Sequence, residues 1–297
     1  MLAVVQFYWS AVVLLLPLLA CAGIGAYWAK RDYPFGGTFI TMLVTTVTTP
    51  ALVFHTFVTT QLDDRALLAI AGASLLALLA CALACAGLLR LFGLPVRTLL
   101  PTAFVPNAGN LGLPVSQLAF GDAGLSAAVA FFAVNSFVTH TIAVRMLPGA
   151  NTPGSWKSPV LLASVAAVTL RALDIPVPDW LGATSRMLGA VTVPLMLLSL
   201  GHALALIPAN GMRAGAVVAA LRLAVGLAAG YAVVWLLGLP DLLAGALALQ
   251  MAMPCAVVSY MYARRYTDVG DIAAGAVLVS TVVFLLLAPA LLWFTRQ

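Results

Sequence analysis

The chain has 297 residues, of which 63% are hydrophobic and only 8% are charged, and its mean hydropathy is +1.10. Charged residues make up roughly a quarter of a soluble globular domain, so this composition excludes that class and indicates an all-α polytopic membrane protein. The formal net charge of +5 comes from basic residues that stand mostly singly or in pairs, which favours cytoplasmic loops over nucleic-acid binding. The four cysteines lie in apolar runs, so we expect neither a metal site nor a cofactor.

Apolar segments of membrane length follow one another along the chain. Crossing the hydrocarbon takes about 20 apolar residues. Cutting at Pro, Gly and charge clusters predicts ten transmembrane helices at 6–29, 38–61, 66–89, 98–120, 124–147, 158–174, 182–206, 213–237, 241–263 and 270–294. Most of the 14 Lys and Arg residues fall on one side if the N-terminus faces outward. The positive-inside rule therefore predicts both termini on the non-cytoplasmic side.

The two halves of the chain resemble each other at an offset of about 145 residues. Val47-Thr48-Thr49-Pro50 matches Val191-Thr192-Val193-Pro194, and Pro106 matches Pro254. Because each half holds an odd number of helices, the second half is inverted, which is typical of secondary transporters. The predicted organisation is a five-helix repeat at 1–147, a short cytoplasmic linker at 148–157 and an inverted repeat at 158–297.

The fourth segment is interrupted by Pro106-Asn107-Ala108-Gly109-Asn110-Leu111-Gly112-Leu113-Pro114, which disfavours a continuous α-helix. Broken backbone at membrane depth is tolerated only where it is buried in protein or lines a polar cavity. Features of six segments lie within about one helical turn, roughly 5 Å, of mid-bilayer. They are Pro50, Gly109, Asn135, Pro194, Pro254 and Ser280-Thr281. This convergence predicts a binding site at the midplane.

A helix that starts at mid-membrane has free amide donors with partial positive charge, which suit a carboxylate. We expect such starts near Leu111 and Cys255. The candidate substrate-binding residues are Thr49, Asn107, Gly109, Asn110, Asn135, Arg222, Gln250, Pro254, Ser280 and Thr281. The candidate helix-breaking residues are Pro50, Pro106, Gly112, Pro114, Pro194 and Pro254.

Three groups among these candidates have alternative interpretations. Arg222 can be a counter-charge for an anionic substrate, an anchor on freed carbonyls of a broken helix, or a side chain that snorkels toward the cytoplasm. Asn107 and Asn110 can bind the anion or only satisfy broken backbone. His140, about one turn from Asn135, is the best-placed group for proton coupling, with a hydrogen-bonded structural histidine as the alternative.

The run Asn107 to Pro114, followed by Phe120-Gly121-Asp122 and Gly124-Leu125, resembles the fourth-span signature of the auxin efflux carrier family. Met253-Pro254, Tyr266, Asp268 and Ser280-Thr281 extend the resemblance over essentially the whole chain. The family includes plant PIN proteins and bacterial carriers for malate or malonate. The short linker differs from the long hydrophilic loop of PIN proteins.

This resemblance implies a fold similar to bile-acid/sodium symporters, with broken helices four and nine crossed. It implies a transport domain at 66–147 and 213–297. The scaffold at 1–61 and 158–206 would form a homodimer through helices 1, 2, 6 and 7.

These features predict a carrier for a small organic anion, a mono- or dicarboxylate, in a bacterial inner membrane. It would work by alternating access of the elevator type, in import or export. An anion channel at the same site and a Na⁺- or H⁺-coupled carboxylate symporter are the alternatives, besides a carrier driven by membrane potential alone. An enzyme is not expected, because no nucleophile–base pair or metal-ligand cluster lies at mid-depth.

Overall fold

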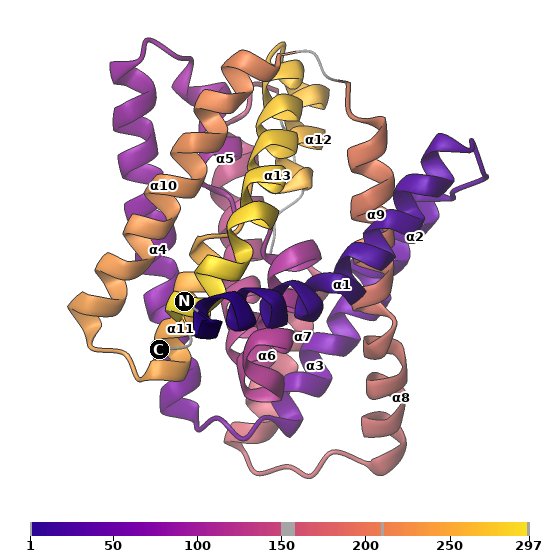
Figure 1. Ribbon diagram of the computed structural model, residues 1–297. Coiled ribbons are helices and arrows are strands. Elements are labelled where there is room, and N and C mark those ends of the chain that lie inside the picture. The colour runs from indigo at the N-terminus through magenta and orange to yellow at the C-terminus, as the bar shows by residue number, and fades with distance from the viewer. Residues whose placement is uncertain (1, 150–157, 209–210, 296–297) are drawn as a thin grey trace.

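The computed structural model describes residues 2–149, 158–208 and 211–295, and most of the linker predicted at 148–157 lies outside them (Figure 1). The described chain is helical apart from its connections and one isolated bridge. Six of its helices are long and apolar enough to cross a membrane: Gly37–Thr59, Asp64–Leu91, Ala108–Met146, Asp179–Leu206, Met212–Leu237 and Gly270–Leu292. Shorter apolar helices lie at Leu15–Lys30, Pro159–Ala172 and Asp241–Met251. The protein is therefore an all-helical polytopic membrane protein.

The helices of the first half are α1 (Leu2–Lys30), α2 (Gly37–Leu43), α3 (Thr49–Thr59), α4 (Asp64–Leu91), α5 (Val96–Phe104) and α6 (Leu113–Val138). Three π-helical turns, η1 (Val44–Thr48), η2 (Ala108–Gly112) and η3 (Thr139–Ala143), and a 3₁₀ turn, η4 (Val144–Met146), adjoin them. The second half has α7 (Pro159–Ala172), α8 (Asp179–Ala190), α9 (Thr192–Leu206), α10 (Met212–Leu237), α11 (Asp241–Met251), α12 (Val257–Tyr266) and α13 (Gly270–Thr295). Each apolar segment expected from the sequence coincides with one or more of these helices.

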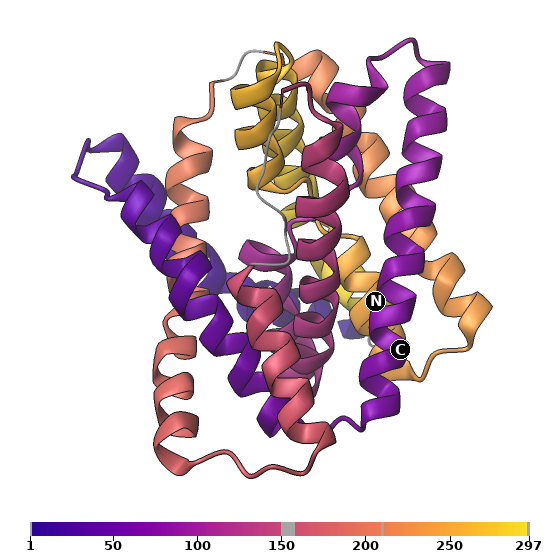
Figure 2. The same cartoon turned by 180° about the vertical axis from the view of Figure 1, so that it is seen from behind.

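The helices pack in two groups (Figures 1 and 2). In one group α1 lies along α9, and α3 lies against α7 and α8. In the other, α10 lies along α13 and α4, and α6 lies against α4 and α11. The pairs recur with the two halves exchanged, since α7 packs on α3 as α1 packs on α9, and α4 packs on α6 as α10 packs on α13.

Small residues set the closest approach of α1 and α9. A Cβ at Gly25 would collide with the backbone of Leu198, and one at Gly201 would collide with the backbone of Ala22. Glycine in membrane helices allows backbones to come into contact in this way. The two helices therefore touch along their backbones.

Several connections lie at two opposite ends of the molecule. Figure 1 shows the α3–α4 and α7–α8 connections at the lower end and the α4–α5 and α12–α13 connections at the upper end. Gly121 turns the chain back within α6, with φ 66° and ψ −155°. Because Arg97 Nε donates to Met146 O at 2.8 Å, the chain returns beyond this turn to the level of the start of α5.

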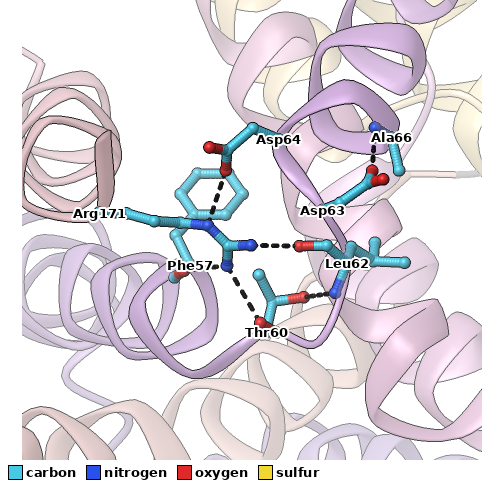
Figure 3. A network of polar contacts seen from close by, with 7 residues as sticks. All are labelled: Phe57, Thr60, Leu62, Asp63, Asp64, Ala66 and Arg171. Atoms are coloured by element: carbon cyan, nitrogen blue, oxygen red, sulfur yellow. Dashed lines mark hydrogen bonds and ion pairs between the residues drawn. The ribbon is translucent and has the colours of Figure 1, made fainter. Parts of the chain in front are cut away.

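Arg171, at the end of α7, is bonded to the α3–α4 connection (Figure 3). Its Nε donates to Asp64 Oδ1 at 2.7 Å, its Nη1 to Thr60 O at 3.0 Å and its Nη2 to Leu62 O. This connection is where the chain passes from the first helix group to the second. Arg171 therefore fixes the junction between the two groups on this side.

Candidate functional site

The two interrupted segments meet at their breaks. Pro106 and Cys255 form an isolated antiparallel bridge. On one side of it Asn107 N–H donates to Pro254 O at 2.8 Å, and on the other Ala256 N–H donates to Val105 O at 3.2 Å. Val105 and Cys255 are buried. Each break thus satisfies backbone groups of the other, as buried backbone at membrane depth requires.

The new helices start within three residues of the positions expected from the sequence. η2 begins at Ala108 and α12 begins at Val257, whereas the sequence indicated Leu111 and Cys255. A π turn, in which Gly112 N–H donates to Asn107 O at 3.0 Å, keeps the glycine-containing run helical. Pro114 lies in the first turn of α6, where its missing amide costs no helical hydrogen bond, so it begins the new helix.

The prolines of the repeated Val-Thr-x-Pro run lie close to helix starts as well. Pro50 is in the first turn of α3, directly after the π turn η1. Pro194 lies near the start of α9, after a turn at Val191. Both therefore mark a change in helix geometry within a longer helical rod.

Arg222, on α10, holds the carboxyl-terminal ends of both broken helices. Its Nε donates to Met253 O at 3.2 Å, its Nη2 donates to Met251 O, and its Nη1 donates to Phe104 O at the end of α5. Cys81 Sγ lies 3.5 Å from Nη1. Helix ends with free carbonyls attract a cation, so each partner suits the guanidinium.

This arrangement favours one of the interpretations of Arg222. Its side chain is 0% exposed, which excludes snorkelling to the surface. Its contacts are those of an anchor on freed carbonyls. Gly226, one turn further along α10, makes space for the guanidinium, because a Cβ there would collide with it. Arg222 therefore holds in place the point where the two interrupted segments, α5–α6 and α11–α12, cross (the crossing).

Other polar residues named from the sequence gather around the crossing. Cys255 N–H donates to Ser280 Oγ at 3.0 Å, which links the break between α11 and α12 to α13. Gln250 Nε2 donates to Ser116 Oγ at 3.1 Å, which links α11 to α6. A Cβ at Gly112 would lie too close to the Gln250 amide, so glycine here leaves space for this side chain.

Several buried polar atoms of the interrupted segments and of α6 and α13 have no hydrogen-bond partner in the described part of the chain. They are Asn107 Nδ2, Asn135 Oδ1, Gln250 Oε1 and Thr281 Oγ1. Buried polar groups are normally hydrogen-bonded, so these unpartnered atoms suit a bound polar molecule or water. Asn110 lies half-buried in η2.

The crossing also borders the other helix group. At Gly109, a Cβ would lie 2.9 Å from the Phe132 ring and 3.6 Å from Met196 Cε on α9. The hydroxyls of Thr48, Thr49 and Thr192, at the starts of α3 and α9, are buried without a partner among the described residues. Thr48 was not singled out from the sequence, although the repeated Val-Thr-x-Pro run contained the signal.

His140 is hydrogen-bonded within its own helix. Its Nδ1 lies 2.7 Å from Ser136 O, and its ring meets Tyr262 edge-on at a centroid distance of 6.4 Å. These contacts agree with the structural interpretation of this histidine. The donor and acceptor roles at Nδ1 depend on its tautomer.

An all-helical membrane protein whose broken helices cross beside unpartnered polar groups has the features of a membrane transporter. A family model described as "Membrane transport protein" matches residues 10–156 and 153–292. The chain therefore belongs to this family, the auxin efflux carrier family, whose members are transporters and not enzymes. No curated protein matches the chain significantly.

Proposed function

We propose that this protein is a carrier for a small organic anion, a mono- or dicarboxylate, which binds at the crossing of α5–α6 with α11–α12. The observation that carries the proposal is the position of Arg222 on the carbonyl ends of both broken helices. Each helix end carries about half an elementary charge. The two carbonyl ends therefore amount to about one negative charge, which one guanidinium balances.

The amide ends of the two new helices are left without a counter-charge. Together they carry about one positive charge. Every Asp in the described chain is exposed, and the sequence contains no Glu, so no carboxylate neutralises them. A bound monoanion would complete this balance, and Asn107 Nδ2 is a buried donor available to it.

The proposed architecture is ten membrane crossings in two inverted repeats. It is supported by the packing pairs that recur with the halves exchanged and by the position of several connections at two opposite ends (Figures 1 and 2). The basic residues favour both termini on the outer side of a bacterial inner membrane.

Alternating access would move one helix group against the other. The proposed transport domain is 66–147 with 213–297, and the proposed scaffold is 1–61 with 158–206, dimerising through helices 1, 2, 6 and 7. The boundary between them is lined by Gly109 on one side and Met196 on the other. A substrate there would lie between the Asn107, Asn110 and Asn135 amides and the Thr49 hydroxyl.

Proteoliposome flux tests this function. Radiolabelled malate, malonate and indole-3-acetate are offered under imposed voltage, sodium and pH gradients. Saturable flux of at least one anion, accelerated by unlabelled anion on the opposite side, is the expected result for a carrier. Single-channel currents without this exchange would identify a channel, and absence of anion flux under every gradient would contradict the proposal.

A further inference from the structure

A cavity of about 640 Å³ lies among α3, the end of α7, the α7–α8 connection and the start of α8. Its volume is within the range of small-molecule sites, roughly 300 to 1,000 Å³. All of its lining residues belong to α3, α7, α8 or the α7–α8 connection, in the first packing group, so the cavity is separate from the crossing. No role described so far uses it.

The cavity is lined by basic groups that suit an anion and by acidic groups that suit a cation. Arg186 and His55 line it, together with Asp174 and Asp179. Among the described residues Arg186 forms no ion pair, and His55 Nδ1 is buried without a hydrogen-bond partner. Arg171 also lines the cavity, but its guanidinium is already bonded to Asp64 and to the α3–α4 connection (Figure 3).

Apolar side chains at the rim point to a lipid as the source of the ligand. Ile175 lines the cavity and is 47% exposed. Leu173 and Trp180, each next to a lining residue in the chain, are exposed as well. Tryptophan concentrates at the boundary between hydrocarbon and headgroups. The cavity lies at the α7–α8 connection, between the shorter apolar helix α7 and the membrane-length segment Asp179–Leu206. Connections between the helices of a membrane protein lie at the level of the lipid headgroups.

We propose that this cavity binds the headgroup of a phospholipid that carries both a phosphate and an ammonium group, of the phosphatidylethanolamine class. The phosphate is received by Arg186 and His55, and the ammonium by Asp174 and Asp179. The acyl chains lie against the exposed apolar residues at the rim. Phosphatidylglycerol lacks the ammonium and fills only half of the site.

Native mass spectrometry of the full-length purified protein tests this, after incubation with equimolar phosphatidylethanolamine and phosphatidylglycerol. Wild type is expected to retain the ethanolamine lipid preferentially. Asp179→Asn should lose this preference, and Arg186→Gln should weaken retention of both lipids by about tenfold, as loss of one charge-assisted contact does. Asp241→Asn and Arg65→Gln, exposed charges outside the cavity, serve as matched controls.

Equal retention of both lipids by wild type, or variants that match their controls, would overturn the proposal. Melting temperatures equal to wild type show that the variants are folded. A further arm adds soluble O-phosphoethanolamine without lipid, which should bind at least about tenfold more weakly than the lipid does. Equal or tighter binding of the soluble compound would overturn the assignment to a lipid.

Discussion

Arg222 Nη1 donates to the carbonyl of Phe104, a residue 118 positions earlier in the chain. The same guanidinium donates to Met251 and Met253, at the end of the other broken helix. One side chain of α10 therefore joins helix ends from both halves. A buried charge requires such partners, and removing it leaves carbonyls unpaired in a medium that offers no water.

Replacing this arginine should destabilise the crossing. Arg222→Met is expected to lower the free energy of unfolding by about 3 kcal/mol or more, because several buried carbonyls lose their donor. Arg222→Lys should be intermediate, since an ammonium cannot reproduce the planar fork of donors. Thermal denaturation in detergent measures both, with Arg213→Met, an exposed position on α10, as the control. Melting of Arg222→Met at the wild-type temperature would contradict the anchoring role.

Adding a methyl group beside the Arg222 guanidinium should also destabilise the crossing. Gly226→Ala places a Cβ on Arg222 and on the carbonyl of Met251, so overpacking should cost about 1 to 3 kcal/mol. Gly72→Ala on α4 adds the same methyl group where nothing lies within 4 Å, and should be neutral or stabilising. The difference between their melting temperatures is the measurement. Equal melting temperatures would show that Arg222 has space to move away.

Replacing the buried threonines at the boundary between the two helix groups should change transport without lowering the stability of the protein. Thr49→Val and Thr192→Val remove hydroxyls without a hydrogen-bond partner among the described residues, so stability should stay equal or rise. If these hydroxyls contact the substrate, KM should rise by about tenfold. Flux against substrate concentration gives KM, and Thr184→Val, at an exposed position of α8, is the control. An unchanged KM in both variants would show that these hydroxyls do not contact the substrate.

Arg171 should contribute more to the free energy of unfolding than its ion pair with Asp64 alone does. Asp64 is 63% exposed, and exposed pairs contribute only about 0 to 1 kcal/mol, so Asp64→Asn should be nearly neutral. Arg171→Gln also removes the donors to Thr60 and Leu62, and should cost about 1 to 3 kcal/mol more. Comparing the two melting temperatures checks this order. A larger loss in Asp64→Asn would mean that the carboxylate and not the backbone contacts holds the junction.

The positions at which the helices are interrupted could be predicted from the residues themselves. Pro106 and Pro254 cannot donate to a helix, and a polar run in an apolar segment is visible without any contact being known. The starts of η2 and α12 were missed by a few residues. The reason is that a π turn can carry Gly109 and Gly112 within a continuous helical path, which periodicity does not reveal.

Long-range contacts could not be predicted in the same way. The sequence marked Arg222 as unusual, but its partners depend on where α10 passes behind α5 and α11. Gln250 likewise finds Ser116, 134 residues away, through the packing of α11 on α6. The cavity beside His55 is formed by three helices and a connection, and no motif in the sequence indicates it.

The central claim is that an anion binds at the crossing, and equilibrium binding of radiolabelled malate, malonate and indole-3-acetate to the purified protein tests it most directly. Asn107→Ala removes a buried amide donor at the break, and Gln117→Ala removes an exposed amide on the neighbouring α6. We predict saturable binding of at least one anion to wild type and to Gln117→Ala, and about tenfold weaker binding to folded Asn107→Ala. Equal affinity in all three proteins, or no binding of any anion to wild type, would contradict the claim.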